Sequence, residues 1–401
     1  MNILFLTISE VDDIEQRGIY TDLLRKFRDE KHTLYVVSPL ERKFKTKTFL
    51  KKTSGINVLR VKTLNLLKTN IIEKGIGTVL IDYQYLKAIK KYFDNIKFDL
   101  LLYSTPPISF IRVVKKIKAK NKAFSYLLLK DIFPQNAVDI ELIKPDGMIY
   151  RFFRRKEKEL YEISDYIGCM SPANVEFLKK NNPQIPAHKI EICPNSIAPV
   201  EYKENIPERI TIRQKLNIPQ ESIVFIYGGN LGKPQGLGFL LDVLSSNKEK
   251  NNCFFLIVGS GTEFFKIKNW FNKNRIINAL LIQKVPKDDY DSLLSACDVG
   301  LIFLDPRFTV PNYPSRLLPY LEKKMPVLAA TDINTDIGKI AEENKYGFWC
   351  ENGDLEKFNY YIDFFINNPH LIQELGHNGY SFLHDNYTVN LSYSIIIKHF
   401  T

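Results

Sequence analysis

Residues 222–246 read SIVFIYGGNLGKPQGLGFLLDVLSS, and this stretch holds a complete strand–turn–helix unit. The segment 222–230 is an apolar run that ends in two glycines, which predicts a buried strand followed by a tight turn. Residues 237–246 then carry apolar side chains at helical spacing. A buried strand that leads through a glycine turn into a helix is typical of parallel α/β domains.

The same unit recurs along the whole chain. In the second half, further strands are predicted at 252–261, 279–285, 298–305 and 325–330, with helical segments such as 291–297 between them. In the first half, the predicted strands are 2–8, 32–39, 56–61, 99–105, 123–131 and 165–171, and the predicted helices are 18–31, 76–93, 108–120 and 147–163. This alternation predicts parallel sheets that are covered by helices on both faces.

Chain length and alternation together predict two doubly wound α/β domains. A chain of 401 residues is too long for one ordinary core. The pattern pauses in the stretch 191–202 and then restarts. We therefore expect a first domain over 1–198, a second over 199–386, and a C-terminal helix over 387–401 that returns to the first domain. Ligands of this fold class bind at the carboxyl ends of the strands, here in a cleft between the two domains.

The composition excludes several classes of protein. No apolar run reaches the ~18–20 residues of a membrane span, and the N-terminal segment MNILFLTISEVDD predicts a buried strand instead of a signal peptide. The six histidines are scattered and form no metal-ligand pattern. The cysteines are widely spaced without a C-x-x-C pair, which favours reduced thiols in the core: Cys169, Cys193, Cys253, Cys297 and Cys350.

The net charge of +11 is concentrated in the first half of the chain. Residues 1–200 hold 35 Lys and Arg against 22 Asp and Glu, whereas residues 201–401 hold 21 against 23. The basic excess predicts an anionic partner, which could be a membrane surface, a nucleic acid or a phosphorylated substrate. A composition that is simply rich in lysine is the alternative. The segments 115–122 and 150–158 are basic, the second also aromatic, and they suit docking on an anionic membrane face.

Three loops of the second half each follow a predicted strand, so we expect them on one edge of the sheet. In the loop 227–236, Gly228 and Gly229 let the backbone approach a ligand closely, and Lys233 adds a cation. The loop 258–264 contains G-x-G, but Phe264 stands in place of a third glycine. This departure argues against a nicotinamide site and favours a backbone turn near a ligand.

The third loop, 310–316, is stiffened by Pro311 and Pro314. Ser315 offers a hydroxyl, and Arg316 offers a planar guanidinium that matches phosphate oxygens. Together the three loops predict a diphosphate site. A plain strand-to-helix turn and a solvated arginine are the alternatives.

In the first half, Asp131 stands at the carboxyl end of the predicted strand 123–131. A carboxylate at that position could act as a base, orient a sugar hydroxyl or cap the next helix.

The ordered motifs of the chain carry a family resemblance over essentially its full length. The chain resembles retaining GT-B glycosyltransferases of family 4, and most closely the bacterial, fucosamine-transferase-like branch that builds O-antigen and capsule repeat units. The matching stretches are Ser104–Pro107, Asp131–Asn136, the PNS sequence at 194–196, Tyr227–Gly236, Pro314–Arg316 and Met325–Ala329.

This resemblance implies two Rossmann-like domains that face each other across a cleft. It also implies transfer of a hexosyl or N-acetylhexosaminyl group, with retention of configuration, from a nucleotide diphosphate donor, a UDP-sugar being favoured. The acceptor would be a saccharide linked to polyprenyl diphosphate, in the synthesis of capsule or O-antigen. Because no D-x-D motif stands beside a strand end, we expect no metal and no cofactor, and the protein's own cations would stabilise the leaving diphosphate.

The resemblance also assigns roles to single residues. The catalytic residues would be Asp131, Arg316 and Lys233. The acceptor side would include Gly18, Thr105 and Lys130. The donor diphosphate and nucleotide would be bound by Gly228, Gly229, Asn230, Gln235, Gly259, Val285, Pro286, Tyr313, Pro314 and Ser315.

The chain departs from the family pattern at two positions, Pro311 and Pro319, where most members have glutamates. The second glutamate commonly contacts the donor ribose. Its loss favours an alternative, a non-catalytic partner subunit with the same fold. A UDP-sugar 2-epimerase is a further alternative, but the additional carboxylates and histidines that it needs are not found.

Partners and location follow from the same reasoning. A nucleic-acid partner is disfavoured because no reader motif is present. We expect a cytoplasmic protein that lies peripherally on the anionic inner face of the plasma membrane.

Overall fold

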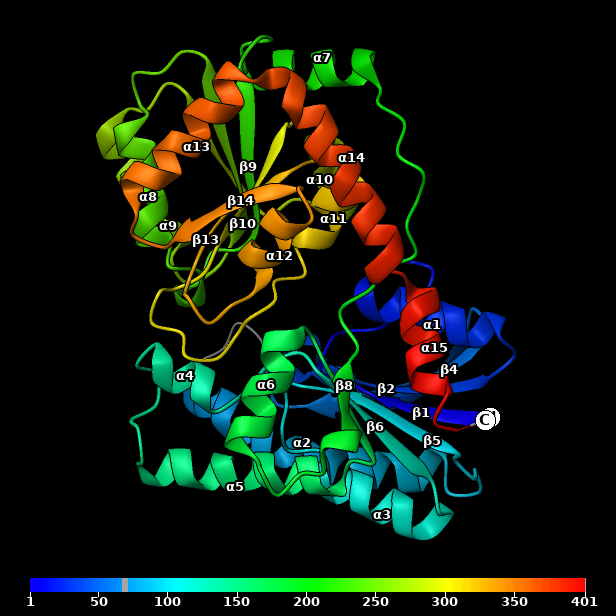
Figure 1. Ribbon diagram of the computed structural model, residues 1–401. Coiled ribbons are helices and arrows are strands. Elements are labelled where there is room, and N and C mark those ends of the chain that lie inside the picture. Colours follow the sequence, from blue (N-terminus) through cyan, green and yellow to red (C-terminus); the bar gives the residue numbers. More distant parts are fainter. Residues whose placement is uncertain (67–70, 401) are drawn as a thin grey trace. The chain divides into compact units, whose positions relative to one another are not determined.

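The computed structural model describes residues 1–66 and 71–400. The chain divides into two compact units (Figure 1): unit 1 comprises Met1–Ala198 and Thr388–Thr401, and unit 2 comprises Pro199–Tyr387. Each unit contains one sheet with helices on both of its faces, which confirms the predicted doubly wound α/β class.

The sheet of unit 1 has the strand order β3-β4-β2-β1-β5-β6-β7-β8. Its strands are β1 (Asn2–Leu6), β2 (Thr33–Glu41), β3 (Phe49–Thr53), β4 (Ile56–Thr63), β5 (Leu100–Ser104), β6 (Phe124–Leu129), β7 (Tyr166–Cys169) and β8 (Ile190–Ile192). Six of them confirm predicted strands. The exception to the expected parallel order is β3, which pairs antiparallel with β4 through a turn at Ser54 and Gly55.

The helices of unit 1 lie in two layers. Figure 1 shows α2, α3 and α5 on one face of the sheet and α1 and α15 on the other. Their bounds are α1 (Ile19–Asp29), α2 (Ile71–Tyr92), α3 (Ile111–Asn121), α4 (Gln135–Asp139), α5 (Met148–Ile163), α6 (Pro172–Asn181) and α15 (Val389–Ile397), with 3-10 turns η1 (Arg42–Phe44) and η2 (Ala187–Lys189).

The C-terminal helix α15 packs into unit 1 against α1. The rings of Phe27 and Tyr393 lie 5.0 Å apart, and the Tyr393 hydroxyl is hydrogen-bonded to His32 Nε2 at 3.0 Å. Val389 and Ile396 are buried in the same core as Leu23 and the strands β1 and β2. The helix thus covers apolar surface that α1 alone would leave exposed to water.

The sheet of unit 2 is parallel throughout, in the order β11-β10-β9-β12-β13-β14. Its strands are β9 (Ile223–Asn230), β10 (Cys253–Ser260), β11 (Ala279–Gln283), β12 (Val299–Phe303), β13 (Val327–Thr331) and β14 (Gly347–Glu351). Its helices are α7 (Ile206–Lys215), α8 (Leu237–Ser246), α9 (Phe264–Asn274), α10 (Lys287–Ser295), α11 (Leu317–Glu322), α12 (Ile337–Glu343), α13 (Leu355–Asn367) and α14 (Pro369–Asn386), with the 3-10 turn η3 (Lys233–Gln235).

Each sheet has one point at which the strand order changes direction. In unit 1 this switch point lies between β1 and β5, and in unit 2 it lies between β9 and β12. Crossover helices leave such a point on opposite faces of the sheet, so a crevice opens at the carboxyl ends of the two strands. The loops after β1 and β5, and those after β9 and β12, are therefore the places where each unit can bind a ligand.

The cysteines agree with the expected reduced thiols in the core. All five cysteines are unpaired and buried. Within the described residues, no helix is both long enough and apolar enough to cross a bilayer.

Candidate functional site

The switch point of unit 2 is built around Tyr320 on α11. Strands β9 and β12 pair only through Val299 with Phe225 and Gly300 with Ile226, so the two strands separate towards their carboxyl ends. The buried Tyr320 hydroxyl fills this gap: it accepts from Gly228 N at 3.1 Å and lies 3.3 Å from the Ile226 carbonyl oxygen. A side chain thus replaces the backbone ladder where the strands diverge.

Arg316, one turn before Tyr320, lies over this opening. Its guanidinium stacks 4.4 Å above the centre of the Tyr227 ring, and its Nη2 donates to Gln235 Oε1 at 2.5 Å. Its Nη1 is buried, and within the described chain it has no hydrogen-bond partner. Because an unpaired buried donor is costly, this Nη1 is the group in the site most in need of an acceptor.

The environment keeps Arg316 charged. Burial acts to lower the pKa of the guanidinium, but the phenols of Tyr227, Tyr320 and Tyr290 outweigh it, and the pKa of Arg316 is raised above its ordinary value. Burial also raises the pKa of Tyr320 to about 12, so this phenol stays neutral at physiological pH. The site therefore presents one fixed positive charge among neutral hydroxyls.

Next to Arg316 lies an edge of the sheet without side chains. Gly229 has φ 130°, a backbone conformation that favours glycine, and a Cβ there would stand 3.7 Å from the guanidinium carbon. Its neighbour in the register, Gly259, approaches so closely that a Cβ would lie 2.0 Å from the Gly229 carbonyl oxygen. The two glycines leave a flat backbone surface beside the cation, as a bound anion requires.

The structure brings some of the predicted donor residues to Arg316. Gly228, Gly229, Gln235 and Gly259 gather around it, as described above. Asn230 ends β9, where its carbonyl accepts from the Tyr227 hydroxyl at 2.7 Å. Lys233 has an exposed side chain on η3, the same turn that carries Gln235.

The other predicted donor residues have mainly structural contacts. The Tyr313 hydroxyl is hydrogen-bonded to the Tyr387 hydroxyl. Pro314 and Ser315 offer their carbonyls to Leu317 and Leu318 at the start of α11, and the Ser315 side chain is exposed. Val285 is half-buried and the exposed Pro286 caps α10, the helix that carries Tyr290.

The two prolines that depart from the family pattern fit the local backbone. Pro319 is the third residue of α11, where a helix has no intrahelical partner for an N–H. Pro311 is buried in the loop before the helix. Neither position carries a carboxylate near Arg316.

In unit 1, the predicted acceptor residues gather where β5 and β6 end. The Thr105 hydroxyl accepts from the amides of Lys130 at 3.0 Å and Asp131 at 3.1 Å, and it donates to the Asp131 carbonyl at 3.0 Å. Cis peptide bonds precede Pro106, Pro107 and Pro134 in the flanking loops. Thr105 therefore fixes the backbone from which the Lys130 and Asp131 side chains project.

The side chains around Asp131 have perturbed protonation. Asn136 Nδ2 lies 3.4 Å from Asp131 Oδ1. Burial lowers the pKa of the Lys130 ammonium to about 8, although the nearby thiols of Cys193 and Cys169 act to raise it. Burial raises the pKa of Tyr20, on α1, to about 12. The hydrogen bond to Ser104 acts to lower this pKa, and the charge of Asp131 acts to raise it. Such a set of titratable groups at a switch point is typical of a functional site.

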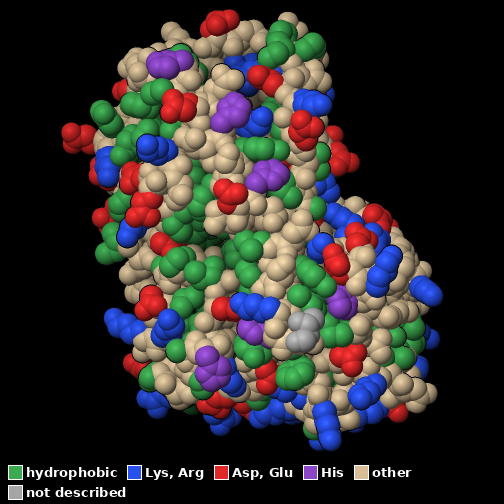
Figure 2. Space-filling model, turned by 45° about the vertical axis from the view of Figure 1, so that its right-hand side comes forward, with side chains coloured by type: hydrophobic (Ala, Val, Ile, Leu, Met, Phe, Trp, Pro, Cys, Tyr) green, Lys and Arg blue, Asp and Glu red, His purple; other side chains and the backbone are tan. Residues whose placement is uncertain are grey.

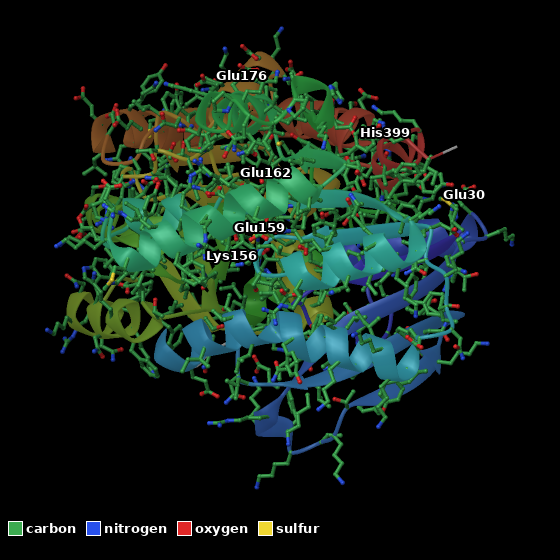
Figure 3. All side chains as sticks on the ribbon, turned by 90° about the horizontal axis from the view of Figure 1, so that it is seen from below. Glu30, Lys156, Glu159, Glu162, Glu176 and His399 are labelled. Atoms are coloured by element: carbon green, nitrogen blue, oxygen red, sulfur yellow. The ribbon has the colours of Figure 1, made fainter. Side chains whose placement is uncertain are left out.

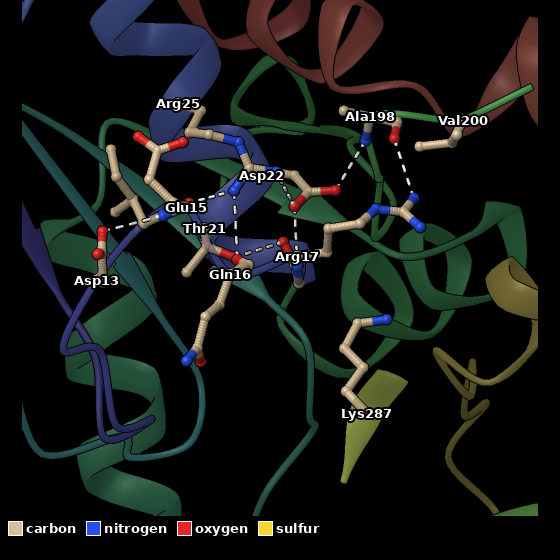
Figure 4. Close-up of polar contacts among 12 residues, drawn as sticks. Asp13, Glu15, Gln16, Arg17, Thr21, Asp22, Arg25, Ala198, Val200 and Lys287 are labelled. Carbon is tan, nitrogen blue, oxygen red and sulfur yellow. Dashed lines mark hydrogen bonds and ion pairs between the residues drawn. The ribbon is translucent and has the colours of Figure 1, made fainter. Parts of the chain in front are cut away.

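Gly18 begins α1 at the same edge and is held by a carboxylate network (Figure 4). Its amide donates to Asp22 Oδ1 at 2.8 Å, and Asp22 also pairs with Arg25 and accepts from Ala198 N at 2.9 Å. Arg17 donates to the Ala198 carbonyl at 3.1 Å. The loop before α1 is thus anchored to Ala198, the residue at which the chain leaves unit 1 for unit 2.

Sequence reasoning missed the aromatic setting of Arg316. Tyr227 stands inside one motif that was singled out, Tyr320 lies four residues after Arg316, and Tyr290 lies on α10, where its hydroxyl sits against Gly228. A tyrosine is common in a strand or a helix, so only the fold shows that these three converge. Within the described residues, no group of three His, Cys, Asp or Glu side chains is arranged to hold a metal ion.

Comparison with known proteins places this geometry in context. Residues 208–382 match the family described as Glycosyl transferases group 1. A probable glycosyltransferase, WbjE of Pseudomonas aeruginosa, is 24% identical over 293 residues, which are 72% of this chain and 70% of WbjE.

Among solved structures, sucrose-phosphate synthase of Thermosynechococcus elongatus aligns with a TM-score of 0.77 at 12% identity, over 99% of this chain and 98% of its own. Anabaena HepE in complex with UDP aligns with a TM-score of 0.72 at 15% identity, over 100% of this chain and 99% of HepE. WaaG, a glycosyltransferase involved in lipopolysaccharide biosynthesis, aligns with a TM-score of 0.67 at 13% identity, over 98% of each chain. These likenesses confirm the expected GT-B fold.

Proposed function

We propose that this chain is a retaining glycosyltransferase that transfers a hexosyl or N-acetylhexosaminyl group from a nucleotide diphosphate donor, a UDP-sugar being favoured. The observation that carries the proposal is the half-buried, charged Arg316, whose buried Nη1 has no hydrogen-bond partner among the described residues. The proposal is also supported by the HepE structures, which were solved in complex with UDP and with UDP-glucose.

In this proposal, the cation acts on the leaving group. When the bond to the donor sugar breaks, negative charge builds up on the diphosphate. A guanidinium already fixed by Tyr227 and Gln235 stabilises that charge without moving, and burial strengthens the interaction. The backbone beside Gly229 gives the diphosphate room to approach. Lys233, on its exposed turn, would contribute only as a mobile second cation.

Unit 1 would bind the acceptor and the donor sugar. Asp131 would orient a sugar hydroxyl, and the Lys130 ammonium would meet the diphosphate of a polyprenyl-linked saccharide. The loop at Gly18 and the fixed backbone at Thr105 would shape this side. The protein would lie peripherally on the anionic inner face of the plasma membrane and serve capsule or O-antigen synthesis. The basic excess of residues 1–200 and the likeness to WaaG support this part.

Nucleotide release with UDP-, GDP- and ADP-sugars tests the proposal. We expect UDP release in the presence of a lipid diphosphate-linked saccharide, and a product whose anomeric proton coupling in NMR matches the donor. Arg316→Ala should abolish most of the activity. Arg307→Ala is a matched control, because this arginine of the same loop is already paired with Asp305 at 2.8 Å.

One observation favours a second candidate function. Pro311 and Pro319 leave the site without the family's two glutamates, as a non-catalytic partner subunit would. Such a subunit would bind none of the three nucleotides. A UDP-sugar 2-epimerase would instead convert the donor without any acceptor, and the same assay would detect the isomer.

A further inference from the structure

The start of α5 exposes large apolar side chains to solvent. Met148 is 90% exposed and Ile149 is 62% exposed. Phe152 on the same helix and Leu142 in the preceding loop are also exposed. Phe153, the residue after Phe152, turns inward and packs against Phe133 with ring centres 5.0 Å apart. The exposed residues are therefore not the remainder of a core. Large apolar groups gathered on a surface indicate an interaction site.

Helix α2 exposes a second apolar group in the form of a stripe. Ile76, Val79, Leu80 and Tyr83 follow the i, i+3, i+4, i+7 spacing that places them on one side of the helix, and all are exposed. The opposite side of the helix is also apolar and buried, with Ile81, Tyr85 and Ile89 in the core. A helix that is apolar on both sides needs a second apolar neighbour, and the described residues of unit 1 leave this stripe exposed.

The two apolar groups lie on the same face of unit 1, because α3 connects their helices. Ser109, just before α3, donates to the Thr78 carbonyl of α2 at 2.5 Å, and Asp82 of α2 accepts from the amide of Val113. On its other side, α3 is joined to α5 through Lys115 and Glu159 at 2.5 Å. Figure 3 shows α2, α3 and α5 side by side on this face.

Basic side chains surround the apolar groups. Arg151 and Arg155 on α5, Arg112 and Lys116 on α3, and Lys87 on α2 are exposed, and none of them forms an ion pair with a described residue. The exposed acids nearby include Glu141, Asp146, Glu162 and Asp94, of which Asp94 pairs with Lys120. Figure 2 shows Lys and Arg side chains gathered along the outer edge of unit 1. The face combines a positive charge excess with exposed apolar groups.

We propose that this apolar–basic face, formed by α2, α3 and the start of α5, docks on an anionic lipid bilayer. The inference rests on the membrane part of the proposed function and assigns it to particular residues. The apolar side chains would enter the boundary between headgroups and acyl chains, while the arginines and lysines bind lipid phosphates. A soluble protein partner would need acidic complementarity to five unpaired cations, whereas an anionic leaflet supplies it everywhere.

Flotation of the full-length protein with vesicles tests the inference. The vesicles are phosphatidylcholine with phosphatidylglycerol, compared with phosphatidylcholine alone. We expect the wild type to bind the anionic vesicles, and Met148→Asp/Ile149→Asp to lower the partition coefficient by about tenfold or more. Arg151→Glu/Arg155→Glu should lower it by a similar factor and reduce its salt dependence. Ile277→Asp, at a 76% exposed position of unit 2, is the matched control and should bind like the wild type.

A tryptophan reporter gives an independent reading. Both native tryptophans, Trp270 and Trp349, lie in unit 2, so Ile149→Trp adds the single indole of unit 1. Its emission should shift to the blue and be quenched by brominated lipids, and Ile277→Trp should show neither effect.

Three results would overturn the inference. If the face variants bind vesicles like the wild type, the protein docks through another surface. If the wild type does not bind anionic vesicles, the membrane part of the proposed function fails as well. If the variants instead abolish self-association in sedimentation while vesicle binding is unchanged, the face is an interface between two copies. UDP affinity, measured on the same variants, should not change in any of these cases, so the donor part of the proposed function is tested separately.

Discussion

The hydroxyl of Tyr313, in the loop that carries Ser315 and Arg316, is hydrogen-bonded to the hydroxyl of Tyr387, the last residue of unit 2. At the far end of α11, Glu322 Oε1 accepts from the amide of Val200, the second residue of unit 2, at 2.8 Å. The segment 313–322 is thus tied to both places where the chain enters and leaves unit 2. The position of Arg316 depends on these two anchors as well as on its own contacts.

The tyrosine pair predicts a coupled loss of stability. Tyr313→Phe and Tyr387→Phe should each lower the free energy of unfolding by about 0.5–1.5 kcal/mol, because each leaves the other hydroxyl without its hydrogen-bond partner. The double variant should cost less than the sum, since the two changes remove one shared bond. Chemical denaturation of the four proteins measures this, with the exposed Tyr360→Phe as the control. Strict additivity would show that the two hydroxyls do not interact.

The close approach of β9 and β10 predicts that Gly259→Ala is destabilising. The added methyl group would meet the Gly229 carbonyl at 2.0 Å, so the strands must move apart, at a cost of about 1–3 kcal/mol. Gly238→Ala is the matched change, since a Cβ there meets nothing within 4 Å and lies in helix α8. It should raise stability by about 0.5–1 kcal/mol. Thermal unfolding distinguishes the two, and equal midpoints would contradict the packing described.

The contact between Gln235 and Arg316 predicts that two substitutions of Gln235, by Leu and by Glu, weaken UDP binding to different degrees. Gln235→Leu should weaken UDP binding by about 1 kcal/mol, because Nη2 loses its acceptor and the guanidinium is less well fixed. Gln235→Glu keeps an acceptor but neutralises the cation, and it should weaken UDP binding more than Leu does. Uridine, which has no phosphate, should bind both variants alike. Stronger UDP binding by the Glu variant would contradict an anion site at Arg316.

The lowered pKa of Lys130 predicts a pH dependence of stability. In the folded protein the ammonium loses its proton at about pH 8, whereas in the unfolded chain it does so near the ordinary lysine value. Between these two pH values the unfolded state binds more protons, so stability rises with pH. Relative to Lys130→Met, the wild type should therefore gain stability above about pH 8 and show a constant difference below it. A difference that stays constant across this window would contradict the buried position of the ammonium.

The elements with continuous apolar runs were predictable from sequence. Strands such as β5 and β9 and helices such as α1 and α8 appear where the pattern placed them, because burial on both faces leaves a strong signal. The edge strands β3 and β14 were missed. The sequence of β3, FLKKT, is mostly exposed, and its pairing depends on the turn at Gly55, which a local pattern does not reveal.

The site was predictable as a set of loops but not as a set of contacts. Gly228, Gly229 and Arg316 could be placed on one edge because parallel strands end together. Arg316 stacks on Tyr227, and Tyr320 inserts between β9 and β12. Both contacts join side chains to positions 80 or more residues away in the sequence, so a local pattern does not reveal them. Lys233 lies on η3, the turn that also carries Gln235, with its side chain exposed, so its role beside Arg316 stays a prediction.

Calorimetric titration of the wild type and of Arg316→Ala with UDP and with uridine tests the central claim most directly. The account predicts that the wild type binds UDP, and that the variant loses about 1.5–3 kcal/mol of UDP affinity, as expected for a charge-assisted contact. Uridine affinity should be the same in both proteins. UDP binding that is unchanged in Arg316→Ala, or absent in the wild type, would contradict a diphosphate site at this arginine.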